Sequence, residues 1–111
     1  MKKKLYHITS VDKIDSILEN GLRANEYGDI YLFDNVSIRL DDRTFYVADH
    51  IAKNQIFCDT YAMFEVDVKG IHKPIKQDVC GELTTKQQYV VNQKVINKKH
   101  ISIFGIFDVE M

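Results

Sequence analysis

The sequence predicts one α+β domain spanning residues 1–111, with mixed or mostly antiparallel strands and two helices. Alternating apolar and polar residues indicate several strands, and two stretches with apolar residues three or four apart indicate helices. The last strands follow one another with no helix between them. Because a parallel pair needs a long crossover connection, this order favours antiparallel pairing over a doubly wound parallel sheet.

The first predicted strand is the stretch KLYHIT over residues 4–9. Its alternation places Leu5, His7 and Thr9 on one face, and Tyr6 and Ile8 on the other. A helix is expected to follow directly, with Thr9 as its N-cap.

In that first helix, Asp12 completes an approximate capping box and an apolar stripe ends with Leu18. Gly21 lies where a glycine ends a helix. Further along the chain, a second strand is expected over residues 29–33 and a second helix over residues 41–56.

The second half of the chain is expected to be mostly strand. Residues 61–68 alternate cleanly, with Ala62, Phe64, Val66 and Val68 on one face. A long polar loop follows over residues 70–87, and two further strands are then expected over residues 88–95 and 100–110, on either side of a turn of sequence INKK.

Composition and charge narrow the functional classes. The apolar fraction of 45% supports a packed core, and the net charge of −1 draws the chain neither to nucleic acid nor to an anionic membrane. The only basic cluster in the sequence is Lys2 to Lys4. No stretch has the features of a signal peptide or a membrane span, which predicts a cytoplasmic protein with no membrane partner.

The cysteines and histidines predict no metal site. The two cysteines, Cys58 and Cys80, are expected to be reduced thiols, although one disulfide between them remains open. Their spacing from His50 and His72 matches no zinc pattern, and no local signature supports a nucleophilic thiol.

Three short stretches contain residues suited to a binding site. His7 lies near the end of the first strand, where side chains line crevices, although a lone strand histidine is more often structural. Tyr31 and Phe33 share one face of the second strand and suit either a core or a stacking surface. Gln88 opens an apolar strand after a polar loop that contains Glu82, and its amide suits a sugar hydroxyl.

The order of these stretches resembles the ADP-ribosyltransferase superfamily in its small, stand-alone bacterial and phage forms. The resemblance covers nearly the whole chain and rests on the succession of LYHIT, IDSILENGL, GDIYLFDN, YAMFEVDV and QYVVNQKVINKKHI. It implies two small sheets with NAD bound in the cleft between them. It also implies a macromolecular acceptor, either a protein or a nucleic acid, as in phage or toxin effectors.

The resemblance also implies roles for individual residues. His7 would bind the adenosine-side ribose of NAD, while the backbone of Ile8, with Thr9 beside it, would hold the nicotinamide amide. Tyr31 or Phe33 would stack on the nicotinamide ring.

The chain departs from the family at the start of the late strand, where a glutamate is expected and Gln88 stands. A glutamine holds a ribose hydroxyl but carries no charge to stabilise an oxocarbenium-like sugar. Three outcomes follow: Glu82 or another acid supplies the charge, the enzyme works with a neutral residue, or the domain only binds.

A second alternative is an RNA 2′-phosphotransferase, whose second-strand region is similar to NGLRANEYGDIYLFDN. Such enzymes need several arginines for the phosphate and an additional N-terminal domain. This chain has three arginines, Arg23, Arg39 and Arg43, so a transferase acting on a protein or nucleic acid is the preferred interpretation.

Overall fold

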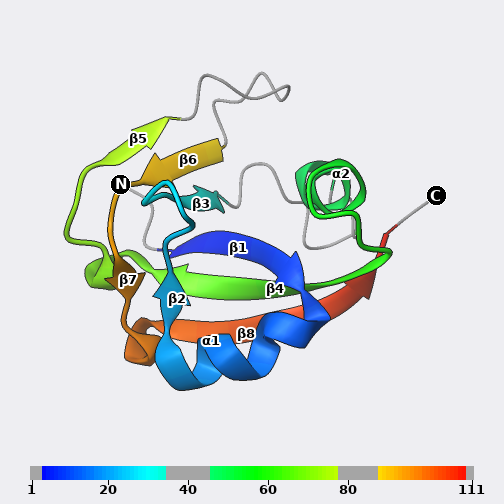
Figure 1. The fold of residues 1–111 in the computed structure, drawn as a ribbon, viewed down its shortest axis with the longest axis horizontal. Coiled ribbons are helices and arrows are strands. Elements are labelled where there is room, and N and C mark those ends of the chain that lie inside the picture. Colours follow the sequence, from blue (N-terminus) through cyan, green and yellow to red (C-terminus); the bar gives the residue numbers. More distant parts are fainter. Residues whose placement is uncertain (1–3, 35–45, 78–87, 110–111) are drawn as a thin grey trace.

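The computed structural model describes residues 4–34, 46–77 and 88–109. Their fold is α+β, with mostly antiparallel strands and few helices (Figure 1), as predicted. In chain order the elements are β1 (Lys4–Ser10), η1 (Val11–Lys13), α1 (Ile14–Asn20), β2 (Leu22–Arg23), β3 (Ile30–Phe33), α2 (Tyr46–Asn54), β4 (Thr60–Asp67), η3 (Val68–Gly70), β5 (Ile75–Gln77), β6 (Gln88–Val91), β7 (Val95–Ile96), η4 (Lys98–His100) and β8 (Ile101–Asp108).

The main sheet has six strands in the order β5-β6-β3-β1-β4-β8, and β2 pairs with β7 in a separate small sheet. All of these neighbours are antiparallel. The pairing of β1 with its two neighbours is unequal. It matches β4 along its whole length, from Lys4 opposite Asp67 to Ser10 opposite Tyr61, but matches β3 only at Tyr6 opposite Phe33. The six-stranded sheet therefore opens between β1 and β3.

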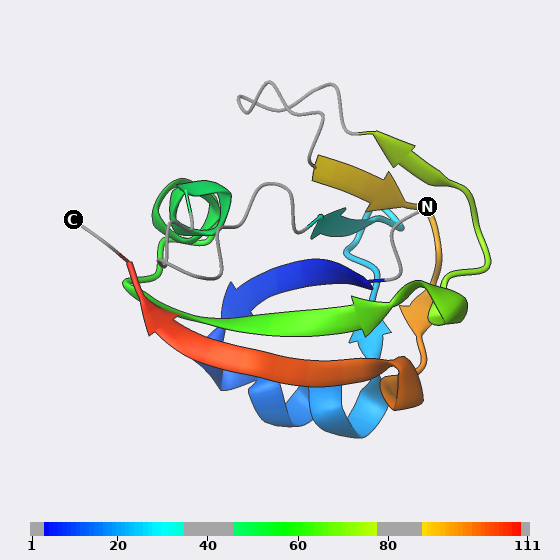
Figure 2. The ribbon, with the colours of Figure 1, turned by 180° about the vertical axis from the view of Figure 1, so that it is seen from behind.

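Two apolar clusters form the core, one on each face of the sheet. Figures 1 and 2 show α1 and α2 on opposite sides of the long strands β1, β4 and β8. The cluster beneath α2 contains Tyr6, Ile8, Phe33, Ala48, Ile51, Ala52, Tyr61 and Met63. The cluster on the α1 side contains Leu5, Ile17, Leu22, Ile30, Leu32, Ala62, Phe64, Val66, Val91, Ile96 and Ile101. Strand alternation in the sequence predicted this division correctly for β1, β3 and β4.

The prediction that Thr9 caps the first helix is wrong. The ladder between β1 and β4 continues through Thr9 to Ser10, so Thr9 lies opposite Ala62 as a strand residue. Ser10 then occupies the N-cap position of the 3-10 turn η1, and its hydroxyl donates to Asp12. The helix ends as expected, because Gly21 has a φ of 85° and its N–H donates to the carbonyl of Ile17.

The structure adds strands that the sequence pattern does not reveal. β2 has two residues, and β5 has three, within the segment predicted to be a loop. The predicted strand over residues 88–95 is not continuous: β6 ends at Val91, and β7 begins at Val95 and pairs with β2 in the other sheet. Such short segments contain no alternation to detect, and their pairing depends on their tertiary neighbours. The predicted second helix is observed as Tyr46–Asn54, while residues 41–45 lie outside the described residues.

Candidate functional site

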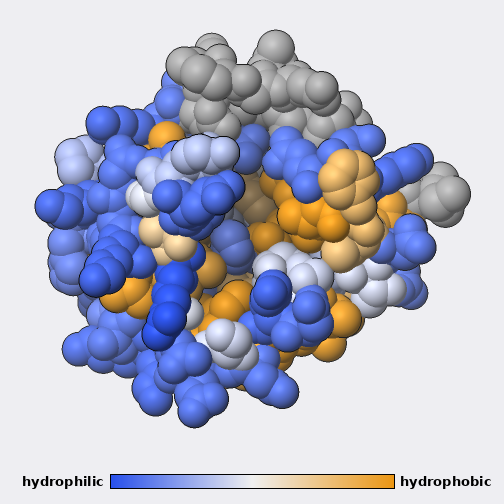
Figure 3. All heavy atoms as spheres, in the orientation of Figure 1, coloured by the Kyte–Doolittle hydropathy of each residue, from blue (hydrophilic) through white to orange (hydrophobic). Residues whose placement is uncertain are grey.

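A pocket lies where the sheet opens, between β1, β3 and β6 on one side and α2 on the other. Figure 3 shows the surface hollowed at this place, with apolar side chains beside the hollow. The lining residues, all uncharged at neutral pH, are His7, Ile8, Tyr31, Phe33, Ile51, Gln55, Ile56 and Gln88. Five of these residues were candidates from sequence, and the fold brings them together from β1, β3 and β6: His7, Ile8, Tyr31, Phe33 and Gln88.

His7 joins the two strands that separate at the opening. Its Nδ1 lies 2.8 Å from the carbonyl oxygen of Tyr31. Since a carbonyl oxygen only accepts, Nδ1 carries the proton and donates to it. In the neutral ring, Nε2 is then an acceptor on a residue that lines the pocket. The side chain thus makes a bond across β1 and β3 where backbone pairing has ceased.

The imidazole of His7 is neutral because of its surroundings. Enclosure by neighbouring groups lowers the pKa of His7 below its ordinary value, and the hydrogen bond to the Tyr31 carbonyl opposes this shift only in part. A neutral ring keeps an acceptor nitrogen at physiological pH, which is what a hydroxyl donor requires.

Acidification is expected to destabilise the protein through His7. Because the pKa of His7 is lower in the folded state, its unfolded form binds the proton first as pH falls. The contribution of His7 is therefore complete above pH about 6.5 and declines below it. Urea unfolding between pH 7.5 and pH 5.0 measures this decline, and His7→Asn, which keeps a donor for Tyr31 but does not titrate, should show a smaller one. An equal decline in both proteins would contradict the assignment.

Gln88 places a buried polar atom in the pocket. The residue is 4% exposed, and its Oε1 has no hydrogen-bond partner. Buried polar atoms in native proteins nearly always have partners, and leaving one unpaired costs about 1–3 kcal/mol. Gln88 lies opposite Phe33 in the register of β6 with β3, so the strand pairing fixes its position beside the opening. Gln88 thus combines an unpaired buried oxygen with a place in the pocket lining.

Tyr31 and Phe33 have different environments, although both line the pocket. Phe33 is 1% exposed, and its ring packs 6.3 Å from that of Tyr6 in the core. Tyr31 is 40% exposed. Tyr31 is therefore the residue with surface available for stacking on a ligand ring, and Phe33 supports the pocket floor.

Of the remaining sequence candidates, one lines the pocket and the others either do not line it or lie outside the described residues. Ile8 lines the pocket, whereas Thr9, which lies opposite Ala62 in the β1–β4 ladder, is not among the lining residues. Glu82 lies outside the described residues, as do Arg39 and Arg43, which are relevant to the phosphotransferase alternative.

Helix α2, through Ile51, and the turn that follows it, through Gln55 and Ile56, supply a wall that sequence reasoning missed. Ile51, Gln55 and Ile56 line the pocket, yet the helical stripe containing the two isoleucines predicts only burial. Nothing in a helical period shows which part of a buried face borders a cavity. In the sequence, only the polar residue Gln55 beside the apolar stripe could have indicated that this part of the segment borders a pocket.

The cysteine–histidine pairs considered from sequence stay untested, because Cys80 and the side chain of His50 lie outside what the structure describes. Cys58 is half-buried and its thiol donates to the carbonyl of Ile56. In the described part of the chain, no three His, Cys, Asp or Glu side chains gather as metal ligands, and no helix is long and apolar enough to cross a bilayer. Arg23 lies on β2 in the small sheet, and the pocket lining does not include it.

Comparison of the chain with family models and with curated proteins gave no match.

Proposed function

We propose that this protein is an NAD-dependent ADP-ribosyltransferase and that the pocket holds the nicotinamide end of NAD. The observation that carries the proposal is the unpartnered, buried Oε1 of Gln88 in a pocket that His7 also lines. The sequence resemblance suggests an ADP-ribosyltransferase fold of two small sheets, and the opening between β1 and β3 in the six-stranded sheet would then correspond to the cleft between them.

The size of the pocket suits one ring rather than a whole dinucleotide. Its volume is about 130 Å³. A protein cavity of roughly 150 Å³ accommodates benzene, so a nicotinamide ring is of suitable size. The remainder of NAD would extend beyond the pocket.

The polar groups also suit this ligand. His7 Nε2 and Gln88 Oε1 are acceptors, while nicotinamide riboside offers donors through its carboxamide and its ribose hydroxyls. Tyr31 is a partly exposed aromatic residue of the lining, and Ile51 and Ile56 add apolar surface. These residues bind and orient the substrate, which brings the reacting groups into one geometry.

NAD would supply a reactive bond between nicotinamide and ribose, whose cleavage transfers ADP-ribose to an acceptor. Gln88 holds a hydroxyl but cannot take up a proton, and the described lining residues include no carboxylate. In this proposal Glu82 supplies the negative charge and accepts the proton of the macromolecular acceptor. The glutamine at position 88 then has a purely positioning role.

A second candidate function is a binding or inhibitor protein of the same fold without catalysis. The uncharged lining of the pocket favours it, because stabilising a developing cation requires a nearby negative charge. In that case NAD or another nucleotide binds and remains intact.

Calorimetric titration with NAD, combined with an assay for nicotinamide release in the presence of cell lysate as acceptor, tests both functions. His7→Asn keeps a donor for Tyr31 but lacks Nε2, and we expect its Kd for NAD to rise about tenfold or more. His72→Asn is the matched control, since His72 is exposed and does not line the pocket.

Each outcome has a distinct meaning. Binding with nicotinamide release supports the transferase, and binding without release supports the second candidate. Absence of binding at millimolar NAD, or equal affinity for wild type and His7→Asn, would overturn the proposed site.

A further inference from the structure

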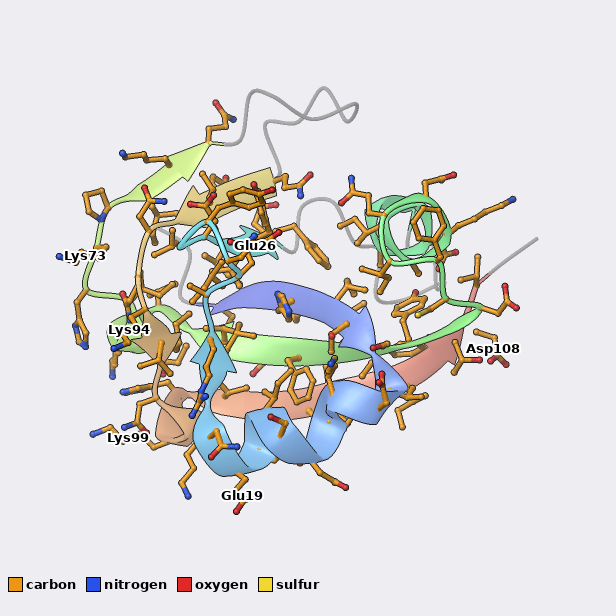
Figure 4. All side chains as sticks on the ribbon, in the orientation of Figure 1. Glu19, Glu26, Lys73, Lys94, Lys99 and Asp108 are labelled. Atoms are coloured by element: carbon orange, nitrogen blue, oxygen red, sulfur yellow. The ribbon has the colours of Figure 1, made fainter. Side chains whose placement is uncertain are left out.

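Six lysines form a face at one end of the molecule, which we name the lysine face: Lys69, Lys73, Lys76, Lys94, Lys98 and Lys99. All six are exposed. Figure 4 shows Lys73, Lys94 and Lys99 along one side of the ribbon, with Asp108 at the opposite end. Residues 68–77 and 88–107, which contain these lysines, include no aspartate or glutamate. Since the whole chain carries −1, the positive charge is concentrated in this region.

Side-chain hydrogen bonds bring the segments of the lysine face together. Gln93 Oε1 accepts from the backbone N–H groups of His72 at 2.7 Å and Lys73 at 3.3 Å. Its Nε2 donates to the carbonyls of Gly70 at 2.9 Å and Val95 at 2.8 Å. One buried amide therefore joins the loop that carries Lys73 to the strand connection that carries Lys94.

The two 3-10 turns of the face also lie against each other. A Cβ atom on Gly70 would lie 2.7 Å from the ring of His100, so η3 and η4 approach closely where there is no side chain. Asp67 accepts from the N–H of Lys69 at 2.9 Å, and Asn97 accepts from the N–H of Lys99 at 3.0 Å. These caps fix the backbone from which three of the six lysines project.

The lysines of the face form no ion pair within the described residues. The ion pairs found within the described residues join Lys4 to Glu65 and Asp67, and none involves the six lysines. Asp67 lies at the border, where the N–H of Lys69 and nearby positive charges lower the pKa of its carboxyl. Like charges gathered without partners repel one another, so a polyanion would stabilise this arrangement.

An exposed aromatic residue lies beside the lysine face. Tyr27 is 79% exposed and lies in a turn. Hydrogen bonds join both ends of this turn to the segment that carries Lys94: Ala24 N donates to Lys94 O at 2.9 Å, and the side chain of Asn92 donates to Asp29. Asn25 Oδ1 accepts from Tyr27 N at 3.0 Å, which fixes the turn. Its acidic neighbours are Glu26 and Asp29, of which Asp29 is bonded to Asn92.

We propose that the lysine face and Tyr27 bind a single-stranded nucleic acid. Lysines act as mobile point charges that follow a phosphate backbone, and an exposed aromatic ring stacks on an unpaired base. The described part of the face consists of short strands and turns, whereas duplex recognition generally places a helix or a two-stranded ribbon in the major groove. This inference goes beyond the proposed function, because the lysine face shares no residue with the pocket lining.

Fluorescence anisotropy with a labelled 20-nucleotide oligo-dT and a matched 20-base-pair duplex tests the proposal without NAD. We expect the single strand to bind more tightly than the duplex, with an affinity that falls steeply with salt. Lys98→Glu/Lys99→Glu should raise the Kd for oligo-dT about tenfold or more and reduce the slope of log K against log salt by about 1.4. The matched control is Lys13→Glu/Lys53→Glu, which changes net charge equally at exposed positions on η1 and α2.

Tyr27 provides an independent readout. Tyr27→Ala should raise the Kd about fivefold or more through lost stacking, while Tyr27→Phe retains a ring and should bind like wild type. Equal weakening by both lysine pairs would show a net-charge effect and contradict a specific face. Tighter binding to the duplex, or binding to anionic vesicles of phosphatidylserine but not to oligo-dT, would also overturn the proposal.

Discussion

Replacing Gln88 by leucine is expected to make the protein more stable and unable to bind NAD tightly. The side chain of Gln88 is buried with an unpartnered Oε1, so it imposes a desolvation cost without a compensating bond. Leucine has a similar size and no polar atom. We therefore expect the free energy of unfolding to rise by about 1 kcal/mol or more. Urea denaturation of the ligand-free protein measures this change.

A rise in the free energy of unfolding together with a loss of NAD affinity would identify Gln88 as a binding residue rather than a structural one. Residues that bind ligands are often not optimal for stability, so their replacement raises stability and lowers function. Gln77→Leu is a suitable control, because Gln77 is exposed on β5 and its replacement should alter stability by less than about 0.5 kcal/mol. A destabilised Gln88→Leu protein would show that the amide has a structural role.

Replacing Gln93 by leucine should have the opposite effect on stability. Its amide makes four hydrogen bonds to backbone groups of His72, Lys73, Gly70 and Val95. Leucine would leave these groups without their partner in a site where the side chain is 7% exposed. We expect a loss of about 2–4 kcal/mol, a large part of the stability of a small domain.

Gln93→Leu should also affect the segments that carry the lysine face. Since Gln93 joins the loop of Lys73 to the connection of Lys94, its loss should also loosen these segments. Amide hydrogen exchange should quicken at residues 71–73 and 93–96 more than in β1 and β4. A Gln93→Leu protein as stable as wild type would contradict the role assigned to this amide.

The two glutamines lie five residues apart in the same region of sequence, and no local pattern separates them. Gln88 opens β6 and Gln93 lies between β6 and β7. One borders the opening in the sheet and the other lies beneath a loop from a different part of the chain. Their roles depend on what the fold places around them, which sequence periodicity does not report.

The candidate site could be predicted to a useful extent because its residues lie on strands. Alternation correctly placed Tyr31 and Phe33 on one face of β3, and the order of the stretches directed attention to His7 and Gln88. The bond from His7 to the Tyr31 carbonyl could not be predicted, because it depends on how β1 and β3 diverge. The wall from α2 was missed for the same reason.

The lysine face shows most clearly the limit of reading a linear sequence. Its six lysines are dispersed over residues 69–99, and the sequence itself shows only one basic cluster, at Lys2 to Lys4. The side chain of Gln93 and the close contact between η3 and η4 bring the dispersed lysines together. Charged residues that are distant in sequence form one charged surface only through tertiary contacts.

The sequence alone determined the α+β class, the long strands, the end of the first helix at Gly21 and which strand faces are apolar. These features follow from short-range chemistry: side-chain alternation, helical spacing and the conformational freedom of glycine. Only the tertiary structure decided where the sheet opens, which helix walls the pocket and which amide stays unpartnered. Each of these depends on contacts between distant segments, whose energies no local pattern records.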